Sequence, residues 1–179
     1  MGTTKIIFSG FGGQGVLTLG QVVADIALNQ GKEVTWMPSY GAEMRGGTAN
    51  CSVIISDKVI GSPIILSNID ILCAMNQPSV DKFLDKTRAG AKVFINSSIV
   101  TDTVVKDDAE IIAIDATNIA VKAGNARTAN MVMMAGFLAQ TGLFTIDELE
   151  AALSRRFKGK AELVEVNMKA IKEGLQALA

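Results

Sequence analysis

Residues 5–15 read Lys5-Ile6-Ile7-Phe8-Ser9-Gly10-Phe11-Gly12-Gly13-Gln14-Gly15, an apolar β-branched run that passes directly into a glycine-rich segment. The run predicts a buried first strand, and the glycines that follow it fit the pattern G-x-G-x-x-G. From Val16 to Asn29 apolar residues recur at helical spacing, and Gly31 comes where a helix C-cap is expected. Strand, glycine turn and helix therefore follow one another as a phosphate-binding turn requires. The alternative is that the glycines serve only a tight turn and close helix–strand packing.

The end of the second predicted strand departs from the pattern of nicotinamide-binding proteins. That strand covers residues 33–37, and the dinucleotide fingerprint predicts an acidic residue near its end, which would bind the ribose hydroxyls. The chain has Pro38-Ser39-Tyr40 there, while Glu33 comes too early and Glu43 too late. An NAD-type oxidoreductase is therefore a weaker alternative than a protein that binds another phosphate-bearing ligand.

Length and composition limit the remaining classes. The chain has 179 residues, of which 49% are hydrophobic, and this suffices for a single domain spanning residues 1–179. The formal net charge of −1 and the lack of a long basic run argue against nucleic acid as a partner. The N-terminus leads straight into the first strand, and no apolar run approaches the roughly 20 residues of a membrane span. We expect a cytoplasmic protein without membrane contact.

The sequence contains no histidine, and its only cysteines are Cys51 and Cys73. The lack of histidine excludes His-based general acid–base catalysis, Ser–His and Cys–His nucleophile pairs, and the commonest zinc sites. The two cysteines are too few for an iron–sulfur cluster and too far apart for a redox C-x-x-C, and each lies in an apolar run typical of the core. We therefore predict no catalytic residue and no metal ligand in this chain.

The remaining periodicity predicts further strands and helices. Strands are expected at residues 48–56, 69–75, 92–96 and 110–115, and Val59-Ile60-Gly61 is expected to pair with the first of these in a hairpin. Helices are expected at residues 79–86, 116–123, 128–140 and 161–178, and Thr145-Ile146-Asp147-Glu148 forms a capping-box pattern. This order predicts an α/β fold of three layers, Rossmann-like and doubly wound, with a mostly parallel sheet, an antiparallel hairpin excursion and a helical C-terminal third.

Three segments together carry a family resemblance. They are Gly10-Phe11-Gly12-Gly13-Gln14-Gly15, Ser39-Tyr40-Gly41-Ala42-Glu43-Met44-Arg45-Gly46-Gly47 and Asn125-Ala126-Arg127-Thr128-Ala129-Asn130-Met131. With these segments the chain resembles, nearly end to end, the gamma subunit of 2-oxoacid:ferredoxin oxidoreductases. The second segment is the specific one, because no generic turn demands a glycine-flanked Glu and Arg two residues apart.

The resemblance implies a subunit of a larger enzyme. That enzyme oxidatively decarboxylates a 2-oxoacid, joins the acyl group to coenzyme A and passes electrons to ferredoxin. Thiamine diphosphate, magnesium and the iron–sulfur clusters are expected only on partner subunits. The expected partners are alpha and beta subunits, with a delta subunit as an optional further one. The isolated chain is expected to lack catalysis, and both a monomer and a homodimer stay open for it. Pyruvate, 2-oxoglutarate, indolepyruvate and branched-chain 2-oxoacids are all compatible substrates, and overall likeness favours 2-oxoglutarate.

The predicted coenzyme A site combines the first two segments. The backbone of the glycine turn, at Gly10, Gly12, Gly13, Gln14 and Gly15, is expected to approach a phosphate, and Arg45 to supply a bidentate contact that Glu43 orients. Alternatively, Glu43 and Arg45 form an exposed pair or an intersubunit salt bridge. Tyr40 stacks on the ligand, lines the subunit interface or packs inside the protein with its hydroxyl bonded to a carbonyl, and these three alternatives stay open. The predicted set is completed by Ser39, Gly41, Gly46, Gly47 and Thr48.

The third segment is expected at the start of a long helix. Arg127, Thr128 and Asn130 are candidates for binding an anion or the thiamine-bearing subunit, and the alternative is simple helix capping by Thr128. Met131, Met133 and Met134 are expected to fill the core, the alternative being a pliable surface covered by another subunit.

Two other functions compete with that of a subunit that binds coenzyme A. They are a nucleotide-sensing module without chemistry and a free-standing NAD-type enzyme.

Overall fold

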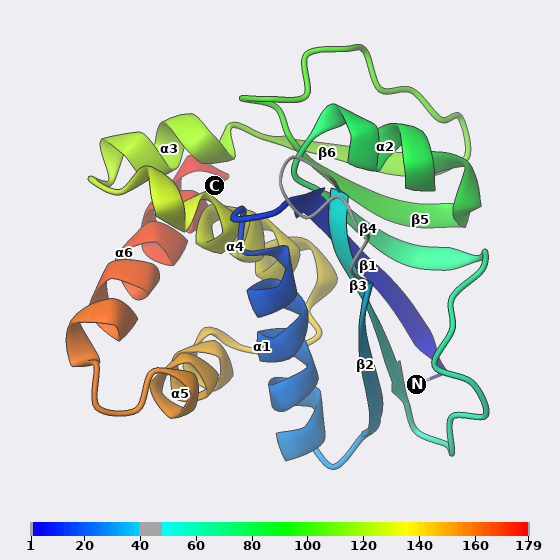
Figure 1. Cartoon of the computed structure of the whole chain (residues 1–179), viewed down its shortest axis with the longest axis horizontal. Coiled ribbons are helices and arrows are strands. Elements are labelled where there is room, and N and C mark those ends of the chain that lie inside the picture. The colour runs from blue at the N-terminus through cyan, green and yellow to red at the C-terminus, as the bar shows by residue number, and fades with distance from the viewer. Residues whose placement is uncertain (1, 40–47, 179) are drawn as a thin grey trace.

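The centre of the fold is a six-stranded sheet, seen in a computed structural model that describes residues 2–39 and 48–178 (Figure 1). Its strand order is β2-β3-β1-β4-β5-β6. The strands are β1 (Thr4–Phe11), β2 (Glu33–Ser39), β3 (Thr48–Ser56), β4 (Ile69–Ala74), β5 (Thr87–Asn96) and β6 (Ala109–Ile114). Strands β1, β4, β5 and β6 pair in parallel, whereas β3 pairs antiparallel with both β1 and β2. The predicted mostly parallel sheet with an antiparallel excursion is confirmed.

Helices cover both faces of this sheet and make the fold three-layered. They are α1 (Val16–Asn29), α2 (Gln77–Phe83), α3 (Ala116–Lys122), α4 (Ala129–Thr141), α5 (Ile146–Arg156) and α6 (Ala161–Ala177), with short 3-10 turns η1 (Leu84–Lys86) and η2 (Ala126–Thr128). Side chains alternate between the faces of β1, so that Phe8 packs with Leu19 of α1 in one cluster and Ile7 with Val80 of α2 in another. The predicted helical C-terminal third packs in the first cluster and is confirmed (Figure 1).

The larger cluster is centred on aromatic rings. The ring of Phe137 on α4 lies 5.7 Å from that of Phe8, 5.8 Å from that of Phe94 and 5.8 Å from that of Phe144, measured between centroids. Three methionines of α4 are also fully buried, which confirms them as core residues: Met131, Met133 and Met134. Apolar residues of the last third of the chain are therefore buried in this cluster.

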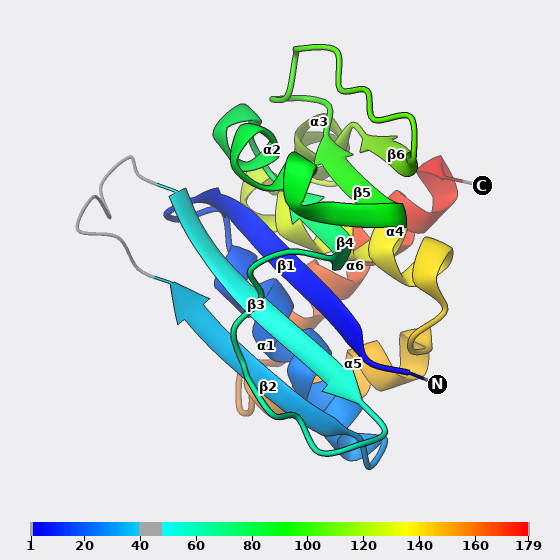
Figure 2. The same cartoon turned by 90° about the vertical axis from the view of Figure 1, so that its right-hand side faces the viewer.

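The hairpin expected between β3 and residues 59–61 is wrong. Strand β3 runs between β2 and β1 and pairs with both, so both of its hydrogen-bonding edges are occupied (Figure 2). No edge is left for a third strand, and the segment after Ser56 crosses to the start of β4 without strand structure. Val59, expected to pair, is instead 87% exposed. The antiparallel excursion is therefore made by β2 and β3.

Helix α5 begins with the predicted capping box. The Thr145 hydroxyl accepts the Glu148 N–H at 3.2 Å, and the Glu148 carboxylate accepts the Thr145 N–H at 2.7 Å. The side-chain amide of Gln30 and the Thr145 N–H hold the pKa of the Glu148 carboxyl below its ordinary value. The box thus ties the start of α5 to the end of α1.

We expect the stabilisation from Glu148 to depend on pH. Because the pKa of its carboxyl is lower in the folded than in the unfolded protein, the carboxylate stabilises the fold above the unfolded pKa, and this contribution is lost as pH falls through the folded pKa. The difference in unfolding free energy between wild type and Glu148→Gln should therefore shrink between neutral pH and about pH 3. Urea unfolding across this range measures it, and Glu150→Gln on the same helix is the control. A difference that does not vary with pH would contradict the assignment.

Candidate functional site

The carboxyl ends of β1 and β4 form a topological switch point. The two strands are parallel neighbours, with Ser9 paired to Ala74, and Met75 N–H continues the ladder by donating to Ser9 O at 2.8 Å. Beyond this point α1 turns onto one face of the sheet and α2 onto the other. The chain segments that follow the two strands must therefore diverge, and in open α/β sheets such a divergence is where ligands bind.

The glycine turn occupies one side of this divergence. It is closed by the Gln14 N–H, which donates to Phe11 O at 3.1 Å, and its third residue Gly13 has a φ of 95°, which favours glycine. Gly15 is the N-cap of α1, makes no side-chain cap, and is followed by a first turn without an acidic residue. The N-terminal N–H groups of a helix have no intrahelical acceptor, so this helix start suits an anion.

The glycines of the turn have two different roles. A Cβ on Gly10 would lie 2.8 Å from Gln14 Oε1 and 2.9 Å from Met75 Cβ, and one on Gly15 would lie 2.3 Å from Asn130 Nδ2. These two glycines are required by close packing inside the protein. Gly12 and Gly13 are exposed, and a Cβ on Gly13 would meet no atom within 4 Å. Of the four glycines in the turn at residues 10–15, only Gly12 and Gly13 present open backbone to a ligand.

The described residues on either side of the second predicted segment lie at the same end of the sheet. Thr48 pairs with Phe11, and Ser39 pairs with Asn50, two residues further along β3. The backbone at Ser39 and Thr48 therefore lies at the glycine-turn edge of the sheet. The other predicted residues of this segment lie outside the described residues: Tyr40, Gly41, Glu43, Arg45, Gly46 and Gly47.

The strand order also explains why β2 does not end in an acidic residue. In dinucleotide-binding folds the acidic residue is on the strand next to β1. Here β3 lies between β1 and β2, so the end of β2 is two strand spacings, about 9 to 10 Å, from the glycine turn. A carboxylate at Ser39 would therefore not occupy the ribose-binding position.

The third predicted segment meets the glycine turn. Asn130 Nδ2 donates to Gly15 O at 3.4 Å, so the starts of α4 and α1 touch. Arg127, on η2, is exposed and lies three residues before Asn130 in the sequence. The expected capping of the long helix by Thr128 is wrong, because its hydroxyl instead donates to Asn125 O at 2.7 Å and α4 has no side-chain cap. Helix α4 continues directly from η2, and its first N–H groups already have acceptors, Ala129 N–H on Ala126 O and Met131 N–H on Asn130 Oδ1.

Other residues at this end of the molecule belong to no sequence motif. Arg156, at the end of α5, donates from Nη2 to Thr18 Oγ1 at 3.3 Å and so places a cation beside the first turn of α1. Asn76 and Ser79, after β4, are completely buried polar residues next to the turn. Arg156 is 138 positions from Thr18 along the chain, and no local pattern marks such a pairing.

The chemistry of the described residues favours binding. Burial raises the pKa of both thiols, Cys51 and Cys73, to about 12, so neither supplies a thiolate near neutral pH. Both are buried core residues, as predicted. Within residues 2–39 and 48–178, no three His, Cys, Asp or Glu side chains gather as metal ligands, and no helix has the length and apolar character to cross a membrane.

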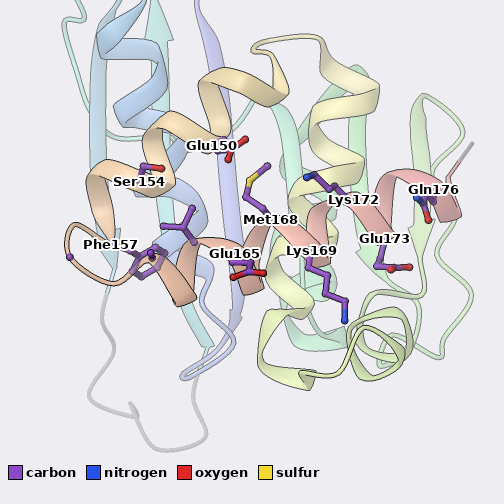
Figure 3. Close-up of a pocket in the computed structure, with 12 residues that line it drawn as sticks. Glu150, Ser154, Phe157, Glu165, Met168, Lys169, Lys172, Glu173 and Gln176 are labelled. Carbon is purple, nitrogen blue, oxygen red and sulfur yellow. The ribbon is translucent and has the colours of Figure 1, made fainter.

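A groove of about 970 Å³ lies elsewhere, between α5 and α6 (Figure 3). Its lining includes apolar Phe157, Val164 and Met168, together with charged side chains such as Glu165 and Lys169 (Figure 3). None of its lining residues belongs to the glycine turn or to α1. The groove is therefore separate from the switch point.

Comparisons with known proteins agree with this architecture. The family model described as pyruvate ferredoxin/flavodoxin oxidoreductase matches residues 5–177. Ketoisovalerate oxidoreductase subunit VorA of Methanothermobacter thermautotrophicus is 36% identical over 174 residues, which are 96% of this chain and 36% of that protein. The 2-oxoglutarate synthase subunit KorC of Methanocaldococcus jannaschii is 33% identical over 152 residues, which are 83% of this chain and 81% of that protein.

A solved structure with the same fold is the gamma subunit of a keto/oxoacid ferredoxin oxidoreductase from Geobacter sulfurreducens PCA. It is 31% identical, with a TM-score of 0.81, and the match covers 97% of this chain and 96% of that one. The chain spans about a third of the length of VorA but most of KorC and of the Geobacter subunit. The chain therefore belongs to the pyruvate ferredoxin/flavodoxin oxidoreductase family, and the resemblance to its gamma subunits expected from the sequence is confirmed.

Proposed function

We propose that this chain is the gamma-type subunit of a multi-subunit 2-oxoacid:ferredoxin oxidoreductase and that its glycine turn helps to bind coenzyme A. The reaction of the complex would convert a 2-oxoacid and coenzyme A to acyl-CoA and CO2, with the two released electrons passing to oxidised ferredoxin. The observation that carries the proposal is the exposed Gly12–Gly13 backbone at the switch point, in front of a helix start without a cap. Its position fits a ligand that carries phosphates.

Charge at this end of the molecule supports a phosphate-bearing ligand. Each favourable contact between an anion and a helix start contributes about 0.3–1 kcal/mol, and α1 begins here without an acidic residue in its first turn. Arg127 and Arg156 add guanidinium groups, which suit phosphate. Phosphate contact by Arg45, oriented by Glu43, stays a prediction from the sequence, as does an intersubunit role for the pair.

We assign the chemistry of the reaction to partner subunits. The chain has no histidine, and both of its thiols are buried, so it supplies neither a nucleophile activated by histidine nor an exposed thiol. Thiamine diphosphate, magnesium and iron–sulfur clusters would accordingly be held by partner subunits, namely alpha, beta and, as an optional further member, delta. This chain would contribute coenzyme A binding and subunit assembly.

The 2-oxoglutarate preference expected from overall likeness stays a prediction. One relative is named for ketoisovalerate and another for 2-oxoglutarate. The acyl pocket would lie mainly on the partner chains, so 2-oxoglutarate and 2-ketoisovalerate are the two substrates to compare. A higher kcat/KM for 2-oxoglutarate in the complex would support the preference, and a higher value for 2-ketoisovalerate would overturn it.

We expect the complex, purified from its native cell through a tag on this chain, to reduce ferredoxin in a reaction that requires both a 2-oxoacid and coenzyme A. The isolated chain should bind coenzyme A weakly and show no turnover, because the reacting groups lie on the partners. Ferredoxin absorbance follows the reaction, and calorimetric titration with coenzyme A follows the binding. Arg45→Ala is expected to weaken binding by about tenfold, the equivalent of one charge-assisted contact.

Two results would reject this function. Tight NADH binding with turnover by the isolated chain would favour the NAD-type alternative. Nucleotide binding by a chain that brings down no partner subunit would favour a nucleotide-sensing module. If coenzyme A binding is unchanged in Arg45→Ala, only the role of Arg45 is lost.

A further inference from the structure

A chain of buried polar side chains lies under the switch point. The Ser9 hydroxyl on β1 donates to Ser79 Oγ at 2.8 Å, and the Ser79 hydroxyl donates to Asn76 Oδ1 at 2.6 Å. Asn76 also accepts the Ser79 N–H at 3.0 Å and so forms the N-cap of α2. All three side chains are completely buried. Buried polar groups need hydrogen-bond partners. These hydrogen bonds therefore link the end of β1 rigidly to the start of α2.

Gln14 connects this hydrogen-bond network to the glycine turn. Its Oε1 accepts the Phe11 N–H at 2.6 Å and Asn76 Nδ2 at 3.4 Å, while its Nε2 donates to Met75 O at 3.4 Å. One carboxamide therefore bonds to the turn on one side of the divergence and to the β4–α2 connection on the other. Its oxygen and nitrogen are both engaged, so replacing either atom removes a bond.

Gly10 lies against this carboxamide and leaves no space for a side chain at position 10. A Cβ on Gly10 would lie 2.8 Å from Gln14 Oε1, so a larger residue at position 10 would displace the amide from its partners. Gln14 is only partly buried, and the adjacent Gly12 and Gly13 are exposed. The amide thus holds the turn from below and leaves its outer backbone open.

We propose that Gln14 is a positioning residue for coenzyme A, resting on the proposed function of the glycine turn. Its carboxamide fixes the distance between the turn and the start of α2, so that the Gly12–Gly13 backbone is held in the ligand-binding geometry before the ligand arrives. A turn ordered in advance does not have to lose conformational entropy on binding, and this raises affinity without a direct contact. Asn76 is the fixed point to which Gln14 is tied.

The experiment compares two glutamines of α1 and its flanks in the complete complex. Gln14→Ala is expected to raise the KM for coenzyme A by about tenfold, consistent with the loss of one or two hydrogen bonds, with kcat at saturating coenzyme A unchanged. Gln30→Ala is the matched control, because Gln30 also bonds two distant groups, Leu143 O and Glu148 Oε1, at the other end of the helix. It should lower the melting temperature and leave KM unchanged. Equal increases in KM from both variants would indicate general loosening and overturn the proposal.

Gln14→Glu separates this inference from the proposed function. The glutamate keeps the acceptor for Phe11 and Asn76 but places a negative charge beside a phosphate, so it should raise KM wherever coenzyme A lies at this turn. If Gln14→Glu raises KM and Gln14→Ala does not, the site stands and the positioning role is overturned. If neither variant changes KM, coenzyme A does not bind at this turn, and both proposals fall. Should Gln14→Ala fail to assemble, Gln14→Met fills the same space without polar atoms and is held to the same result.

Discussion

We expect Gly15→Ala to lower the free energy of unfolding by about 2 to 5 kcal/mol. Gly15 has a φ of 74°, where an L-residue is strained by about 1–2 kcal/mol. Its new Cβ would also lie 2.3 Å from Asn130 Nδ2, and such overpacking costs about 1–3 kcal/mol more. Urea unfolding followed by the fluorescence of Trp36, the only tryptophan, measures the change. Because the clash separates the starts of α1 and α4, coenzyme A binding should weaken as well.

Gly13→Ala is the matched control for this effect. Gly13 has a φ of 95° and shares the backbone strain, but its Cβ would meet no atom within 4 Å. Gly15→Ala should therefore destabilise the protein more than Gly13→Ala does, and Asn130→Ala in the Gly15→Ala background should recover the difference. Equal losses in the two single variants would show that Asn130 moves aside freely.

The second large effect is expected from Phe137→Ala, which should lower the free energy of unfolding by about 3 to 5 kcal/mol. Phe137 is completely buried, and its ring joins Phe8 and Phe94 of the sheet to Phe144 at the start of the C-terminal region. Removing the ring leaves a cavity that three rigid rings cannot fill by relaxation. The same unfolding experiment applies.

Leu163→Ala on α6 gives the comparison for Phe137→Ala. Leu163 is 42% exposed, so its truncation is expected to change the free energy of unfolding by no more than about 0.5 kcal/mol. A loss of less than about 2 kcal/mol in Phe137→Ala would mean that the aromatic cluster repacks, contrary to its arrangement here. Neither substitution changes a residue of the glycine turn, so the affinity of the folded protein for coenzyme A should be the same as in the wild type.

Local features were predictable because local rules set them. Helix α1 spans Val16–Asn29 as its periodicity predicted, and the capping box of α5 forms from residues three positions apart. Gly31, with a φ of 77°, ends α1 with its N–H on Leu28 O, as expected of a C-cap glycine. The prediction of a hairpin at residues 59–61 was wrong for the opposite reason. The neighbours of β3 depend on the packing of all strands, and the alternation of residues within one strand does not show which strands pair with it.

The glycines of the turn also show the difference between what a local pattern predicts and what the whole fold determines. The segment from Gly10 to Gly15 holds four glycines, three of them at the positions of the pattern, yet only Gly12 and Gly13 face outward, while Gly10 and Gly15 lie against Gln14 and Asn130. The contact to Asn130 spans 115 positions along the chain. A motif therefore locates the turn but does not distinguish a glycine needed for packing from one needed for ligand approach.

By itself the sequence determined the strand–turn–helix unit, the α/β class, the family and the lack of histidine. These follow from residue types and short-range periodicity, which depend on backbone sterics and on burial of one face of an element. Only the tertiary structure decided that β3 lies between β1 and β2, that Gln14 ties the turn to Asn76, and that Arg156 reaches Thr18. Such pairings are set by the packing of the whole chain, in which each contact is favourable only when many distant ones form with it.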